Sequence, residues 1–194
     1  MEKINSVINL VQHLYSQKNP VIDWNEWVFN GHIKIVAEWV EKISKDHEFD
    51  TQAVLAAAYL HDLAYSFTSK NDPELDEKSE TKAREVLKEA NYSNDEIIFI
   101  VDKIIHGHGM HDGQKPELIE AQVLATADAL AHFTSDFYLV ICWNHYLFEN
   151  KSLNDYKVWV LEKIERDMNK KILLEEYKSV AEPYYIGLKK MFSL

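Results

Sequence analysis

Residues 53–60 read AVLAAAYL, a stretch that is apolar on every side of an α-helix. Such a helix must be covered on all sides, so we expect residues 51 to about 65 to form a central, buried helix with Thr51 as its N-cap. The chain has only 5 glycines and 4 prolines in 194 residues, which favours helices over turn-rich strands. Its length suits one well-buried core. We therefore predict an all-α, single-domain helical bundle over residues 1–194.

Apolar residues at helical spacing predict further helices around the central one. They cover residues 4–15, from 24 or 31 to 45, 78–90, 93–106, from 116 to 130 or as far as 147, and two stretches within 153–191 that separate near Lys170 or at Pro183. The dipeptide Asn19-Pro20 ends the first of them. The polar residues 66–77 form a predicted loop that suits a mobile lid, and the Gly- and His-rich residues 106–116 form another.

The formal net charge, 21 − 32 = −11, restricts the partners of the chain. Long nucleic acids and anionic membranes select basic surfaces, so we expect neither as a partner. A small phosphorylated molecule stays compatible, because a metal ion and a few basic side chains can reverse the field in one pocket. A single cysteine, Cys142, and the lack of a membrane-length apolar run or a signal-peptide layout predict a cytoplasmic protein. A homodimer is the default oligomeric expectation.

Charged and polar side chains occur where the sequence predicts burial. Asp62 follows His61 at the end of the central helix, and Asp128 lies inside the apolar residues 123–131. Buried carboxylates are costly unless they are paired or bound to a cation. His32 is in phase with the inward face of its helix, as is His61. Each group alone is explained as well by hydrogen bonding in the core. Together they suit one divalent ion of Mn, Fe, Co, Ni, Zn or Mg.

The ordered set of His32, then His61-Asp62, then Asp128 resembles the H…HD…D signature of the HD superfamily of metal-dependent phosphohydrolases. The local sequences AAAYLHDLAY and ATADALAHF also resemble the apolar helix that ends in HD and the later Asp-containing helix. The likeness covers a motif core over residues 31–133, onto which we expect the C-terminal helices, residues 150–192, to pack. It implies a bundle of five or more helices around a metal ion that these four residues hold. Asp62 would also orient the attacking water.

Dinuclear relatives in that superfamily use additional histidines between the HD pair and the final Asp. The nearest equivalents here are Glu80 and His106, and Glu80 replaces a histidine. We therefore expect one metal ion and no second one.

We also predict His106 as a catalytic residue beside Asp62, because it ends a helix and can point back into the bundle; the alternative is an exposed polar loop. His108 ranks below it. His132 shares a helix face with Asp128 at four-residue spacing, as does Asp136, so either can support the metal ligand.

The resemblance implies a hydrolase of a phosphate ester or anhydride, with a nucleotide as the expected substrate. The first alternative is a non-catalytic HD domain that binds metal and nucleotide as a sensor or interaction module. The second is a helical interaction protein whose His and Asp residues are incidental. Intact ligand residues favour the enzyme, but no residue pattern identifies its substrate.

Overall fold

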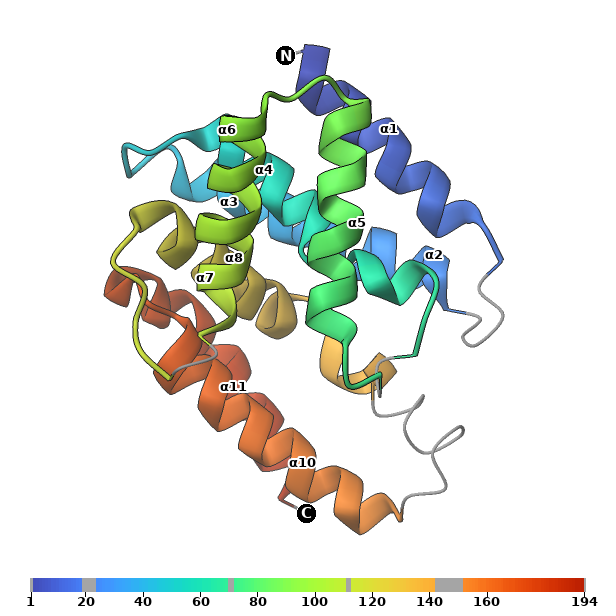
Figure 1. The fold of residues 1–194 in the computed structure, drawn as a ribbon. Coiled ribbons are helices and arrows are strands. Elements are labelled where there is room, and N and C mark those ends of the chain that lie inside the picture. Colours follow the sequence, from blue (N-terminus) through green and yellow to red (C-terminus); the bar gives the residue numbers. More distant parts are fainter. Residues whose placement is uncertain (1, 19–23, 70–71, 111–112, 142–151, 194) are drawn as a thin grey trace.

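The structure is a computed structural model that describes residues 2–18, 24–69, 72–110, 113–141 and 152–193. The elements over these ranges are helical, which confirms the all-α prediction (Figure 1). They are α1 (Glu2–Ser16), α2 (Asn25–Trp27), η1 (Val28–Ile33), α3 (Lys34–Ile43), α4 (Thr51–Leu60), η2 (Leu63–Ser66), α5 (Leu75–Glu89), α6 (Asn94–Ile98), η3 (Phe99–Ile105), α7 (His106–Gly109), α8 (Ile119–Thr134), α10 (Leu153–Arg166), η4 (Asp167–Lys171), η5 (Glu175–Tyr177) and α11 (Lys178–Phe192). Residues 137–141 are helical as well.

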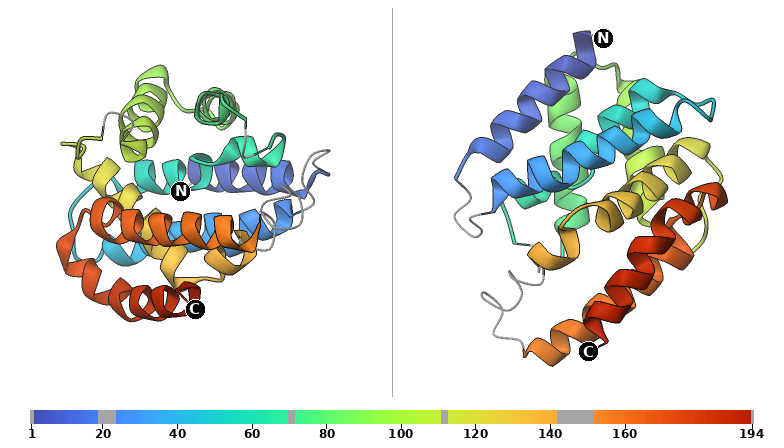
Figure 2. Two further views of the ribbon diagram at one scale, coloured as in Figure 1. Left: turned by 90° about the horizontal axis from the view of Figure 1, so that it is seen from below. Right: turned by 180° about the vertical axis from the view of Figure 1, so that it is seen from behind.

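Helix α4 lies at the centre of the bundle, as its all-apolar sequence predicts. It packs against α1, α3, α8 and η3. The views in Figure 2 show α1, the continuous helix from α2 to α3, α8 and α11 side by side in that order. Helix α10 pairs with α11 and continues into η4, which packs on α8. The C-terminal helices therefore lie against the part of the chain that carries the predicted ligands.

The ends of α4 differ from the prediction. Asp50, not Thr51, is the N-cap, because its carboxylate accepts a hydrogen bond of 3.0 Å from the backbone N–H of Ala53. The helix ends at Leu60 instead of near residue 65, because Asp62 has non-helical φ and ψ angles of −112° and 23°. The chain then turns into the 3₁₀ helix η2. This early end places the His-Asp pair at a helix terminus.

Two predicted helices contain a wide π-helical turn. The second predicted helix begins at Asn25 rather than Gly31 and passes through η1 without a break. A capping box of Ser93 and Glu96 starts α6, which continues through η3 into α7. The prediction of a loop from residue 106 is therefore wrong for His106–Gly109, which form a helical turn that ends where Met110 adopts a φ of 54°.

Further boundaries correct the sequence prediction or select among its alternatives. Helix α8 ends at Thr134 and does not run to residue 147, because Ser135 is extended, with φ −123° and ψ −173°. The C-terminal helices separate near Lys170, and Pro183 lies inside α11. The predicted lid, residues 66–77, already becomes helical at Leu75. Residues 70–71 of that lid, Asn19-Pro20 and Cys142 lie outside the described residues.

No helix in the described ranges has both the length and the apolar character that a membrane span requires.

Candidate metal centre

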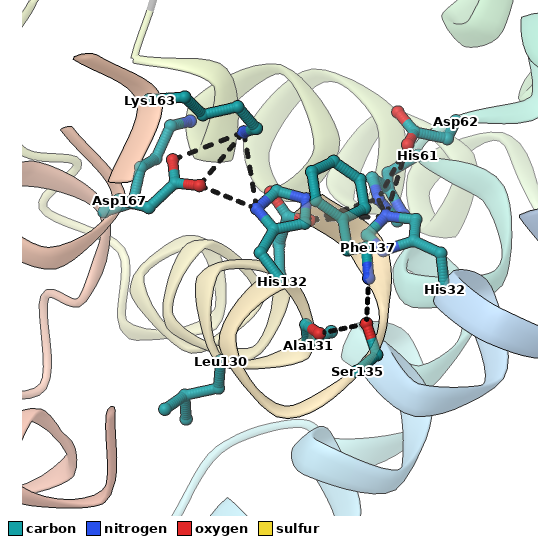
Figure 3. Close-up of polar contacts among 12 residues, drawn as sticks. His32, His61, Asp62, Leu130, Ala131, His132, Ser135, Phe137, Lys163 and Asp167 are labelled. Carbon is teal, nitrogen blue, oxygen red and sulfur yellow. Dashed lines mark hydrogen bonds and ion pairs between the residues drawn. The ribbon is translucent and has the colours of Figure 1, made fainter. Parts of the chain in front are cut away.

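The four predicted ligands come from three separate segments and meet at one point. His32 lies in η1, the His61-Asp62 pair follows α4, and Asp128 lies in α8. The Nε2 atom of His32 lies 3.3 Å from His61 Nε2, 3.3 Å from Asp62 Oδ2 and 3.4 Å from Asp128 Oδ1 (Figure 3). His61 Nε2 lies 3.4 Å from Asp62 Oδ2 and 3.9 Å from Asp128 Oδ1. The structure therefore brings all four side chains together.

Hydrogen bonds to backbone carbonyl oxygens orient the His61-Asp62 pair toward the cluster. The Nδ1 atom of His61 lies 2.9 Å from the carbonyl oxygen of Ala58. A carbonyl only accepts, so Nδ1 carries the proton and the lone pair of Nε2 faces the cluster. The hydroxyl of the buried Tyr15 donates a hydrogen bond of 2.7 Å to the carbonyl oxygen of Asp62. Helix α1 thus fixes the turn that presents the carboxylate.

The cluster is rich in acceptors, which is the condition that a cation satisfies. Asp128 Oδ1 is buried and has no hydrogen-bond partner among the described residues, although two imidazoles lie near it. Ionised carboxylates that converge repel one another unless a donor or a cation lies between them. His32, His61 and Asp128 each offer a ligand atom within 4.8 Å of the others. Imidazole and carboxylate ligands without a thiolate fit a divalent ion such as Mn²⁺, Fe²⁺, Co²⁺, Ni²⁺ or Zn²⁺.

Both carboxyl groups are ionised in this setting. Burial acts to raise the pKa of Asp62, but the imidazoles of His61 and His32 outweigh burial and lower that pKa to about 2. Burial likewise opposes ionisation of Asp128, and four nearby imidazoles, led by His132, hold its pKa well below the usual value. Asp62 keeps 31% of its side chain exposed, against 13% for Asp128. Asp62 is therefore the carboxylate that a bound molecule can reach.

A cavity of about 450 Å³ opens onto the cluster. Its wall combines aromatic, acidic and basic side chains, and includes Trp24, Trp27, Tyr65, His108, His132, Phe137, Trp159, Glu162, Lys163 and Arg166 besides the four predicted ligands. Trp27 stacks on Trp24 with 5.6 Å between ring centroids and donates from Nε1 to Asp136 at 3.0 Å. Its indole lies directly over Gly31, where a Cβ atom would be 2.5 Å from Nε1. The lack of a side chain at Gly31 thus leaves space for the indole of Trp27 in the cavity wall.

A second polar cluster, formed by His132, Lys163 and Asp167, adjoins the four predicted ligands (Figure 3). His132 Nε2 lies 3.2 Å from Asp128 Oδ1, and His132 Nδ1 lies 2.9 Å from Asp167 Oδ2. Asp167 is 1% exposed and also accepts from Lys163 at 3.0 Å and from the hydroxyl of Tyr138 at 2.8 Å. Burial raises the pKa of Asp167, but Lys163 and His132 outweigh burial and lower it. Burial lowers the pKa of His132.

The structure separates the two histidines of the predicted loop. His106 Nδ1 lies 2.9 Å from Glu80 Oε1, its side chain is 58% exposed, and neither residue lines the cavity. The catalytic role of His106 stays a prediction. His108 does line the cavity, with its ring edge-on to that of His61 at 5.4 Å. Burial and the neighbouring His61 lower the pKa of His108 to about 4, so its imidazole is neutral.

The sequence did not predict the contribution of α10 and η4 to the site. Glu162, Lys163 and Arg166 reach the cavity wall, and Asp167 holds His132. These residues belong to the charged run EKIERDMNKK, residues 162–171, which is typical of a solvated helix face. Only the packing of η4 on α8 shows that Asp167 is buried. The four predicted ligands, in contrast, carried a signal because they lie within or at the ends of apolar helices.

A family model for the HD domain matches residues 30–132 of the chain. No curated protein and no solved structure gave a match. The matched segment includes the four residues that meet at the cavity and ends directly at His132. Because the match covers more than half of the 194 residues, the chain belongs to the HD domain family.

Proposed function

We propose that this protein hydrolyses a phosphate ester or anhydride of a small molecule, with one divalent metal ion held by His32, His61, Asp62 and Asp128. The HD family consists mostly of metal-dependent hydrolases. The observation that carries the proposal is the convergence of two imidazole ring nitrogens and two ionised carboxylates, with Asp128 Oδ1 left without a hydrogen-bond partner among the described residues. A divalent ion supplies water that is activated for attack at neutral pH and neutralises charge on phosphoryl oxygens.

The protein residues divide the remaining tasks. The two imidazoles and Asp128 are deeply placed and hold the ion. Asp62 is the more accessible carboxylate and stays ionised above about pH 2, so it can accept a hydrogen bond from the attacking water and orient it. Tyr15 keeps this carboxylate in place through the backbone.

The cavity wall supports a nucleotide as substrate. A volume of about 450 Å³ lies within the range of small-molecule sites. Arg166 and Lys163 stand on the α10 side, where a guanidinium can bind phosphate oxygens. The indole rings of Trp24 and Trp27 offer a flat surface on which a base can stack. We propose a cytoplasmic small molecule rather than a long nucleic acid, because the net charge of −11 repels a polyanion.

Metal content and turnover test the proposal together. Protein purified without chelator should contain about one equivalent of a divalent transition metal by mass spectrometry, and Asp128→Ala should lose it. A panel of nucleoside mono-, di- and triphosphates with added Mn²⁺ should then reveal phosphate release. Asp62→Asn should abolish turnover. Metal and nucleotide binding without turnover would instead indicate a sensor, and wild-type protein that takes up no metal would refute the metal centre.

A further inference from the structure

We propose that Asp167 is a positioning residue that holds His132 as an additional hydrogen-bond acceptor beside the metal centre. This inference rests on the proposed metal site. Neither residue belongs to the four-residue signature, and Asp167 lies outside the matched residues 30–132.

The contacts of Asp167 determine which nitrogen of His132 carries the proton. Its carboxylate is buried and receives donors from His132, Tyr138 and Lys163 at 2.8–3.0 Å. Lys163 already balances the negative charge of Asp167, so the imidazole need not be a cation. It needs only to donate from Nδ1. Lys163 Nζ and His132 Nδ1 lie 3.4 Å apart because both donate to the same carboxylate.

The ring of His132 is also fixed face to face. The ring of Phe137 lies on one side, with 3.8 Å between centroids, and the ring of His32 stacks nearby at 5.1 Å and 14°. In the tautomer that carries its proton on Nδ1, the other ring nitrogen, Nε2, has a lone pair. It lies 3.2 Å from Asp128 Oδ1, an oxygen to which no described residue donates a hydrogen bond. Two acceptors this close require a donor or a cation beside them.

A water molecule at the metal site is the donor that the geometry favours. His132 Nε2 lies 3.2 Å from Asp128 Oδ1, one of the four predicted ligand atoms. His132 would therefore stand beside the ion that these four residues would hold. An acceptor there can bind and orient water while Asp128 holds the ion.

Nitrogen-15 NMR of metal-free protein labelled at histidine tests the proton's position without any turnover. Long-range ¹H–¹⁵N correlation spectra distinguish the two tautomers, and His132→Asn identifies the signals of this ring. We expect Nδ1–H in the wild type. Asp167→Asn can present an amide N–H to Nδ1 and should shift the proton to Nε2, as in the related Asp-His pair of serine proteases, where the amide stabilises the wrong tautomer. Glu162→Gln removes the same charge from the cavity wall and should leave the tautomer unchanged.

Cobalt affinity, measured by competition with a chelating dye, provides the second readout. We expect Asp167→Asn to weaken binding about 10-fold or more, the usual effect of losing a group that orients a metal site, and Glu162→Gln to weaken it less. A wild-type His132 with Nε2–H would overturn the proposal, and so would an Asp167→Asn variant with unchanged tautomer and affinity. If that variant fails to fold, the wild-type spectrum and the affinity of His132→Asn decide. Wild-type protein that does not bind cobalt would refute the proposed function. The tautomer of His132 tests only the role of Asp167.

Discussion

Gly31→Ala tests how the cavity wall is built. An alanine Cβ at this position would lie 2.5 Å from Trp27 Nε1 and 2.7 Å from Cε2, closer than atoms can approach. The indole cannot turn aside freely, because it stacks on Trp24, packs near Phe137 and donates to Asp136. The substitution must therefore displace Trp27 or the backbone next to His32.

The expected loss of stability follows from opposing contributions. Overpacking costs about 1–3 kcal/mol, and losing the Trp27–Asp136 hydrogen bond costs about 0.5–1.5 kcal/mol. The gain in helix propensity from glycine to alanine offsets about 1 kcal/mol. We expect a net loss of about 0.5–3.5 kcal/mol in the free energy of unfolding. In a chain of this size that lowers Tm by roughly 2–4 °C per kcal/mol.

Gly187→Ala is the matched control. Gly187 is exposed in α11 and has no atom within 4 Å of an added Cβ, so alanine should stabilise the protein by about 1 kcal/mol. Urea unfolding gives both free energies, and tryptophan fluorescence reports displacement of Trp27 in the first variant only. The reasoning is refuted if Gly31→Ala stabilises the protein as much as Gly187→Ala does, because the indole would then not pack on Gly31.

Three further predictions concern the metal, a helix cap and pH. A divalent ion at 100 times its Kd should stabilise the wild type by about 2.7 kcal/mol, roughly 5–10 °C in Tm, while Asp128→Ala should show no shift in differential scanning fluorimetry. Asp50→Ala should lower the free energy of unfolding in urea by about 1 kcal/mol because α4 loses its cap; Thr51→Ala should cost less. Metal-free wild type should lose about 2 kcal/mol between roughly pH 7.5 and about pH 5 from His108 alone, a loss that His108→Gln should lack.

The sign of the pH effect follows from the neutral state of His108. The pKa of this histidine falls from 6.5 to about 4 on folding, so the unfolded chain takes up a proton in that window before the folded chain does. The stability contribution is intact above the unfolded pKa and is lost as the pH falls toward the folded pKa. Parallel pH profiles for the wild type and His108→Gln would contradict this account, and equal losses for Asp50→Ala and Thr51→Ala would contradict the assignment of the cap. A thermal shift in Asp128→Ala equal to that of the wild type would remove Asp128 from the metal site.

Helix positions were largely predictable because burial leaves a pattern in the sequence, whereas helix ends were not. Residues 53–60 are apolar all round, and α4 is indeed central. Asp50 and Thr51 are both good caps, and only the backbone angles at Asp50 decide between them. Helix α8 stops at Thr134 although the apolar sequence continues, because Ser135 becomes extended. The spacing of apolar residues shows which face of a helix is buried, but it does not show where the helix ends.

The candidate site divides in the same way. His32, His61, Asp62 and Asp128 were predicted to converge because polar groups in apolar helices need partners or a cation, and because their order resembles the H…HD…D signature. Asp167 could not be predicted, since a carboxylate among charged neighbours carries no sign of burial. Asp167 is buried because η4 packs on α8. The two residues that meet there, His132 and Asp167, are 35 positions apart in the sequence.

The two ends of the chain hold the site from outside its recognisable part. Tyr15 anchors the turn at Asp62, and Asp167 anchors His132, yet both lie beyond residues 30–132. A fragment cut at those limits would carry every signature residue and neither anchor. Substitutions in α1, α10 and η4 can therefore change how firmly the predicted metal ligands are held, and which molecules the cavity accepts, without altering the signature residues. The part of the chain that shapes the site is therefore larger than the segment that the family model matches.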